Sequence, residues 1–269
     1  HYDFDTSPLY SVAIALWHPI ALTDFLRMAD SSIRVHWQHN GLPVAYAGYG
    51  VAAIINAEGV SRFTDTRAQA QAIFSTLTLE VGEHHAEPRF FGGFAFQSDE
   101  PAAPWQSFSP AWFVMPRVML TEVSGQQWLT LTAPLSPECT ANDLHSEAIA
   151  LAACFETYVA RRSKVTPALT SIDYPLPLSA WRQQVNAAVD RIHEGLLEKV
   201  VLSRTCDLGF DVPIDALMVL DRLALRYPDT YRFMISPDEG VAFVGATPEV
   251  LVEVNAPHIR TAAVAGSVG

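Results

Sequence analysis

The chain has 269 residues, of which 49 % are hydrophobic and 17 % are charged, and its formal net charge is −12. This composition excludes a disordered chain and indicates a globular protein with a large core. The excess of acidic residues argues against nucleic acid and against an anionic membrane as partners. A small anionic substrate can still bind where a local cation or a metal ion reverses the sign of the charge.

The first half of the chain is rich in short segments typical of β-strands. A helix is predicted over about 65–79, and the sequence SGQQ at 124–127 predicts a hairpin turn. The predicted strands are 32–38, 44–57, 89–97, 111–123 and 128–135, and the second of them is apolar and glycine-containing, which is typical of a bent strand.

A long helix is predicted from Thr140 to about residue 162, with Thr140 and Asp143 forming a capping box. The segment 163–178 contains three prolines and is predicted to be a linker. A second helix capped by Ser179 follows, then the strand that begins at Lys199. The remaining predicted elements are a helix near 213–226 and strands at 230–236, 241–246, 249–254 and 259–266.

These elements predict an α+β fold, with layered antiparallel sheets and helices packed outside. We expect a β-rich half at 1–163 and the start of a catalytic half at 164–269, intertwined as one domain. The final strand enters a Gly/Ser loop, so we expect a sheet edge without its partner segment.

The chain contains no run of about 18 apolar residues and no signal-peptide pattern at its N-terminus. The three cysteines, Cys139, Cys154 and Cys206, are odd in number and lack metal-ligand spacing. We interpret them as reduced thiols of a cytoplasmic protein.

Lys199 lies at the start of the apolar sequence EKVVLSR. It is either a strand-end lysine whose stem covers apolar neighbours, or a base whose ammonium form is disfavoured by burial. The sequence around the lysine leaves both interpretations open.

Glu249, in VGATPEVLV, poses the same choice between a solvated strand end and a proton donor in an apolar site. Gly266, in AVAGSVG, would allow backbone N–H groups to approach an anion closely. The histidines form no metal motif, and the chain shows no nucleophilic triad and no phosphate loop.

Taken in order, several motifs of this chain resemble the chorismate-utilising enzyme family. The resemblance covers roughly residues 30 to 269, and the first-half motifs are similar to those of isochorismate synthases in particular. The motifs are PRFFGGFAFQ (88–97), PWQSF (104–108), FVMPRVMLTE (113–122), EKVVLSR (198–204), FVGATPEVLV (243–252) and RTAAVAGS (260–267).

The resemblance implies that Lys199 is the general base that activates water to attack C2 of chorismate. It also implies that Glu249 is the general acid that assists departure of the C4 hydroxyl, and that Gly266 and Ser267 bind a substrate carboxylate. Relatives that use ammonia usually carry glutamine in place of the lysine, so Lys199 favours water as the nucleophile.

The resemblance therefore implies a Mg²⁺-dependent isochorismate synthase that serves menaquinone or siderophore and salicylate synthesis, and a monomeric habit. The Mg²⁺ ligands are expected in a C-terminal part that this chain lacks, so no metal ligand is predicted here and the chain alone is expected not to turn over. The alternatives are a salicylate synthase, an anthranilate synthase-like enzyme, or a non-catalytic fragment that binds chorismate.

Overall fold

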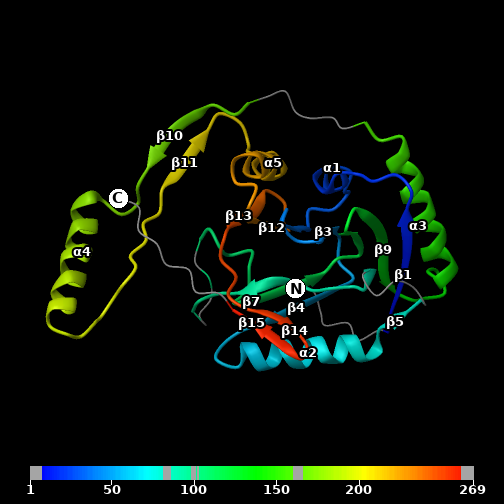
Figure 1. The fold of residues 1–269 in the computed structure, drawn as a ribbon, viewed down its shortest axis with the longest axis horizontal. Helices are drawn as coiled ribbons and strands as arrows, with labels where there is room; N and C mark the ends of the chain where they lie inside the picture. The colour runs from blue at the N-terminus through cyan, green and yellow to red at the C-terminus, as the bar shows by residue number, and fades with distance from the viewer. Residues whose placement is uncertain (1–7, 81–85, 98–100, 102, 160–165, 262–269) are drawn as a thin grey trace. The chain divides into compact units, whose positions relative to one another are not determined.

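The computed structural model describes the chain except for residues 1–7, 81–85, 98–100, 102, 160–165 and 262–269 (Figure 1). The chain divides into two compact units, one formed by residues 1–160 with 216–269 and the other by residues 161–215. Each unit is described separately.

The first unit contains an eight-stranded main sheet in the order β13-β12-β2-β3-β8-β9-β1-β5. All neighbouring strands are antiparallel except the last pair, β1 and β5, which is parallel. The strands are β1 (Leu9–Leu16), β2 (Arg34–Gln38), β3 (Val44–Tyr49), β5 (Thr78–Leu79), β8 (Val118–Val123), β9 (Gln126–Pro134), β12 (Tyr231–Asp238) and β13 (Val241–Thr247).

A smaller antiparallel sheet in the same unit has the order β4-β7-β6. Its strands are β4 (Ala53–Ala57), β6 (Phe91–Phe94) and β7 (Ala111–Met115). A hairpin of β14 (Glu253–Asn255) and β15 (His258–Arg260) follows β13.

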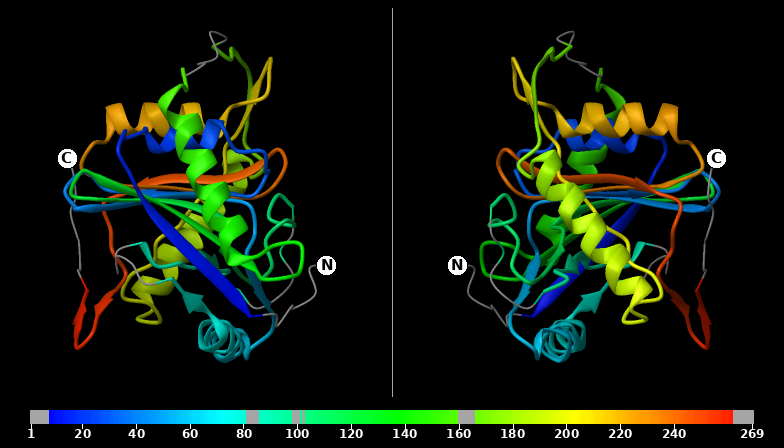
Figure 2. Two further views of the ribbon diagram at one scale, coloured as in Figure 1. Left: turned by 90° about the vertical axis from the view of Figure 1, so that its right-hand side faces the viewer. Right: turned by 90° about the vertical axis from the view of Figure 1, so that its left-hand side faces the viewer.

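Helices cover both outer surfaces of the paired sheets (Figure 2). The helices α1 (Leu22–Arg27), α3 (Ala141–Glu156) and α5 (Ala216–Arg226) pack on the main sheet, and α2 (Arg62–Thr76) packs on β4 and β7 of the small sheet. Phe25 of α1 is fully buried in the core that these helices form with the main sheet, and its ring contacts those of Tyr49 and Phe155. The predicted layered α+β fold is therefore confirmed.

The central strands β8 and β9 of the main sheet are buried on both faces, and the side chains of a strand point alternately to the two faces. In β9, Leu129 and Leu131 belong to the core under the helices. The alternate residues Thr130 and Thr132 point the other way, where Thr130 donates to the Ala86 carbonyl and the Thr132 hydroxyl bonds Ser11. These hydroxyls are buried at little cost because each has a hydrogen-bond partner.

Two local predictions are confirmed in detail. The Thr140 hydroxyl accepts the Asp143 N–H, and the Asp143 carboxylate accepts the Thr140 N–H at 2.9 Å, which completes the capping box of α3. The Thr140 hydroxyl also donates to the Asp143 carboxylate at 2.6 Å, and this bond, together with the one from the Thr140 N–H, lowers the pKa of Asp143. Ser124 and Gly125 both have positive φ, so they form the predicted hairpin turn between β8 and β9.

Two predicted single strands are each two strands that belong to different sheets. The segment 44–57 breaks at Gly50, whose φ of 69° turns the chain from β3 in the main sheet to β4 in the small one. The segment 111–123 breaks at Pro116, between β7 and β8. Proline has no N–H to give to a sheet ladder, and so the strand ends there.

The second unit contains β10 (Leu169–Asp173), α4 (Leu178–His193) and β11 (Asp207–Phe210). The interpretation of 163–178 as a linker is wrong, because β10 lies within it and pairs with β11 more than thirty residues later along the chain. Ser179 does not cap α4, which follows the extended Pro177 and has no side-chain cap.

The division of the chain into halves at 1–163 and 164–269 stays a prediction. Residues from both of these halves share the main sheet, since β12 pairs with β2. None of the described helices combines the length and the apolar character needed to cross a membrane.

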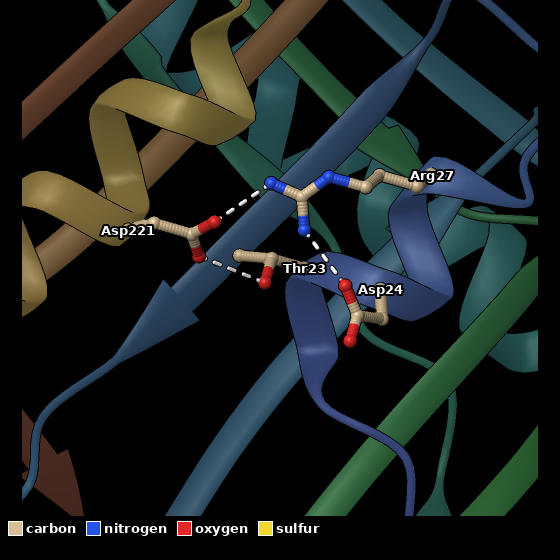
Figure 3. A network of polar contacts seen from close by, with 4 residues as sticks. All are labelled: Thr23, Asp24, Arg27 and Asp221. Carbon is tan, nitrogen blue, oxygen red and sulfur yellow. Dashed lines mark hydrogen bonds and ion pairs between the residues drawn. The ribbon is translucent and has the colours of Figure 1, made fainter. Parts of the chain in front are cut away.

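A network of polar contacts joins α1 to α5 (Figure 3). The Arg27 guanidinium donates to Asp24 at 2.8 Å and to Asp221 at 2.7 Å, and the Thr23 hydroxyl donates to the second oxygen of Asp221 at 3.0 Å. Burial opposes the charge of Arg27, but the hydrogen bonds and charges of the two carboxylates outweigh burial and raise its pKa.

Replacing Asp221 with asparagine is expected to lower the free energy of unfolding by about 1 to 2 kcal/mol, because a partly buried guanidinium loses its charged acceptor. Chemical denaturation measures the change, and a double-mutant cycle with Arg27→Gln isolates the coupling between the two side chains. Glu58→Gln, at an exposed position, is the control. If Asp221→Asn changes the free energy of unfolding equally in the presence and in the absence of Arg27, the ion pair contributes nothing to stability.

Candidate active site

Lys199 lies in the second unit, in an irregular segment between α4 and β11. The helix ends because Gly195 adopts a φ of 73°, and its N–H donates back to the Ile192 carbonyl. The predicted buried strand at Lys199 is wrong, since the lysine is exposed and Val201 is 80 % exposed. An extended segment becomes a strand only when a neighbour pairs with it, and no described residue pairs with 198–204.

The far end of this segment is held by Arg204. Its Nε donates to the Leu176 carbonyl at 3.2 Å, and its guanidinium lies 4.0 Å from the ring centre of Tyr174. Gly195 and Arg204 thus hold the two ends of the segment that contains Lys199, within the unit that α4 and the β10–β11 hairpin form.

Glu249 lies in the first unit, two residues beyond the end of β13. Pro248 ends the strand, and the Glu249 N–H donates to the Thr247 hydroxyl at 3.1 Å, which forms a local turn. The carboxylate is exposed. The strand predicted over 249–254 is wrong in its start, because β14 begins only at Glu253 and pairs with β15.

Lys199 and Glu249 belong to different units, so their convergence stays a prediction. Gly266 and Ser267 lie outside the described residues. Within the described part of the chain no group of three or more histidine, cysteine or acidic side chains is placed to hold a metal ion, so these residues do not fit a Mg²⁺ site.

An apolar cavity of about 620 Å³ lies in the first unit. It is bordered by the edge strand β6, by β7, by β12 and β13, and by the loop between β6 and β7. The residues that line it are Gly92, Gly93, Phe94, Ala95, Phe96, Gln97, Pro101, Ala103, Trp105, Phe108, Ser109, Trp112, Ile235 and Phe243. None of them is charged, so the cavity does not suit chorismate, which carries two carboxylates.

Two motifs far apart along the chain, 88–97 and 104–108, both contribute residues to the lining of the cavity. The aromatic residues and paired glycines of these motifs can be read from the sequence, but their convergence on one cavity needs the tertiary structure. Arg62 of α2 supports one wall, because its guanidinium donates to the carbonyl of Gly59 at 3.1 Å and to that of Ala95 at 3.4 Å.

The two glycines of β6 are expected to differ sharply in tolerance to alanine. A Cβ at Gly92 would collide with the Trp112 carbonyl oxygen and lie 2.6 Å from the Cα of Phe113, whereas a Cβ at Gly93 meets nothing within 4 Å. Gly92→Ala should therefore lower the free energy of unfolding by about 2 kcal/mol, the usual scale for overpacking against backbone. Chemical denaturation of both variants measures the difference, and equal stabilities would contradict the close approach of β6 to β7.

The described residues form a layered α+β fold, and the motifs of the chain resemble those of the chorismate-utilising enzymes. The sequence model of the chorismate binding enzyme family matches residues 5–269, and the chain belongs to this family.

The chain is 28 % identical to the isochorismate synthase MenF of Bacillus subtilis over 267 residues, which is 96 % of this chain and 56 % of that protein. It is 26 % identical to the salicylate biosynthesis isochorismate synthase of Pseudomonas aeruginosa, over 87 % of this chain and 48 % of that protein. The solved structure of MenF, the menaquinone-specific isochorismate synthase from Escherichia coli, is similar in fold. Its TM-score is 0.66 at 22 % identity, over 91 % of this chain and 52 % of that chain. The chain thus spans about half the length of these relatives.

Proposed function

We propose that this chain forms part of an isochorismate synthase, an isomerase that adds water at C2 of chorismate and removes the C4 hydroxyl. The observation that carries the proposal is the family match over residues 5–269, together with Lys199 in KVVLSR and Glu249 in TPEVLV. Relatives named isochorismate synthase support the same reaction.

In the proposed reaction Lys199 takes a proton from the attacking water while the new C–O bond forms at C2. The ring double bonds shift, the bond from C4 to its hydroxyl breaks, and Glu249 protonates the departing oxygen to give water. The backbone around Gly266 and Ser267 would hold a carboxylate of the substrate by N–H donation. Atoms balance, because one water enters and one leaves.

We also propose that the reaction depends on Mg²⁺, with the ligands of the metal outside the described residues. None of the steps given above involves the metal. Three further properties are proposed on the resemblance alone. They are a cytoplasmic location, a monomeric state, and a role in the synthesis of menaquinone or of siderophores and salicylate. Salicylate synthase is the second candidate, which the resemblance to the chorismate-utilising enzymes leaves open.

Product analysis tests the proposed function. This chain is first combined with the part of its relatives that it does not span. The mixture is then incubated with chorismate in the presence of either Mg²⁺ or EDTA. Isochorismate as the product supports the proposal, whereas salicylate with pyruvate favours the second candidate. Anthranilate in the presence of ammonia favours an anthranilate synthase-like enzyme. Chorismate binding without turnover favours a non-catalytic binding module.

A further inference from the structure

We propose that Thr247 is a positioning residue for Glu249. Its hydroxyl holds the backbone of the glutamate, so that the carboxyl group is presented to the departing C4 oxygen from a fixed place. The proposal rests on the proposed function, because Thr247 acts only through the proton donor. The motif VGATPEVLV gave a role to its glutamate and none to its threonine.

A single hydrogen bond connects the two residues. The Glu249 N–H donates to the Thr247 hydroxyl oxygen at 3.1 Å, across the intervening Pro248. A threonine that accepts the N–H two residues later closes a tight local turn. Glu249 lies beyond the last pair of β12 and β13, which joins Tyr231 to Thr247, so no ladder bond between these strands holds its N–H. The hydroxyl therefore takes over at the point where the sheet stops.

Thr247 is itself anchored to the main sheet. It is the last residue of β13, and its partner Tyr231 is the first residue of β12. The ring of Tyr231 packs against those of His39 and Trp37, with centres 4.4 Å and 5.6 Å apart. The strand end that carries the hydroxyl is thus fixed to β2 and to the residue that follows it.

The register of β13 decides on which face of the sheet the hydroxyl lies. Phe233 of β12 pairs with Gly245, and a Cβ at this glycine would collide with the Phe233 ring. Gly245 and Thr247 are two residues apart, so they face the same side. A slip by one residue would put a side chain under the ring and turn Thr247 to the opposite face. The close approach at Gly245 therefore fixes the side from which Glu249 is held.

This arrangement matters for proton transfer. A general acid works only within hydrogen-bond reach of the oxygen that it protonates, and a small misplacement of a catalytic group is costly. Pro248 has no N–H and a fixed φ, so it ends the strand without holding the residue that follows. Loss of the Thr247 hydroxyl would free the Glu249 N–H and let the carboxyl group wander. The loss should appear in kcat more than in KM, because substrate binding does not depend on where the proton donor points.

Two substitutions at Thr247 test the proposal in protein that includes the part carried by the relatives. Thr247→Val keeps the shape of the side chain but removes the acceptor, and it should lower kcat for isochorismate formation about tenfold while KM changes less than about twofold. Thr247→Ser keeps the hydroxyl and should retain at least about half of kcat. Thr64→Val is the matched control, because the exposed Thr64 hydroxyl on α2 donates to the Ser61 carbonyl at 2.7 Å and has no part in the proposed reaction.

A double-mutant cycle separates positioning from a merely structural role. In the Glu249→Gln background, Thr247→Val should cause no further loss of kcat, because no proton donor is left to position. A further loss of about tenfold would overturn the proposal by showing that Thr247 acts elsewhere in the fold. So would full activity of Thr247→Val beside an impaired Glu249→Gln. Full activity of Glu249→Gln would instead overturn the proton donor assigned under the proposed function, and the role of Thr247 with it.

Amide hydrogen exchange of the Glu249 N–H gives a readout without chorismate. It is expected to be at least about threefold faster in Thr247→Val than in Thr247→Ser, because only serine keeps the acceptor. Equal exchange in the two variants would overturn the proposal, since the hydroxyl would then not hold the glutamate.

Discussion

Replacing Lys199 with glutamine is expected to lower kcat for isochorismate formation by at least about 10²-fold, the usual contribution of a general base. Glutamine keeps much of the length of the side chain but cannot accept a proton from water. Substrate affinity should fall less than kcat, because the proposed role of the lysine is to act on the water and not on chorismate. The measurement is kcat and KM, with chorismate loss and isochorismate formation followed directly, in protein that includes the part carried by the relatives.

Lys199→Ala should lose activity to a similar degree, and Glu249→Gln should also lose most of kcat because the departing C4 oxygen is no longer protonated. Arg191→Gln, at an exposed position in the last turn of α4, is the matched control for loss of a positive charge nearby in the sequence. A kcat close to that of the unmodified protein in Lys199→Gln would mean that the lysine is a surface residue and that the base lies elsewhere.

The exposure of Lys199 in the second unit bears on this prediction. A lysine in water is largely protonated at neutral pH, and it becomes a useful base only where burial disfavours the ammonium form. Catalysis by Lys199 therefore requires that its segment is covered in the active protein. The same condition applies to the exposed carboxylate of Glu249, whose role as a proton donor needs an apolar surrounding.

Stability is expected to fall by about 3 kcal/mol as the pH is lowered from 6.5 to 4, through the single side chain His36. His36 lies in β2 and is almost completely buried, and its Nδ1 has no hydrogen-bond partner among the residues that the structure describes. Burial, with a smaller contribution from the charge of Arg232, lowers its pKa from 6.5 to about 4, while Asp221 acts in the opposite direction.

The sign follows from which state takes up the proton. Below pH 6.5 the unfolded chain protonates His36 while the folded protein does not, so protons favour unfolding until the pH reaches about 4. The contribution is fully present above pH 6.5 and is lost progressively below it. Chemical denaturation across this range measures the loss.

Glutamine at position 36 cannot titrate. Between pH 6.5 and 4 the free energy of unfolding of His36→Gln should therefore fall less steeply than that of the unmodified protein, whatever the stability of the variant at pH 8. His258→Gln, in the exposed β14–β15 hairpin, is the control for replacing a histidine with glutamine. If His36→Gln and the unmodified protein lose stability in parallel, His36 is charged in the folded state and the predicted burial of a neutral ring is wrong.

Local patterns predicted the elements that depend on neighbouring residues alone. The capping box of α3 needs only Thr140 and Asp143, three residues apart, and the turn at Ser124 and Gly125 needs only two residues with positive φ. In contrast, no element was predicted before residue 32, although β1 and α1 lie there. The segment LYSVAIAL of β1 is apolar apart from Ser11, and a short apolar run of this kind is ambiguous between a buried strand and a buried helix.

The sequence by itself determined the family and the candidate residues Lys199, Glu249, Gly266 and Ser267, because these depend on residue identity and order within motifs. Only the tertiary structure decided that 44–57 and 111–123 each divide between two sheets, that β10 pairs with β11, and that 88–97 and 104–108 meet at one cavity. The physical reason is that strand pairing and burial come from contacts between residues far apart in the chain. Local propensity contains no information about which distant segment will supply the hydrogen bonds and the apolar cover.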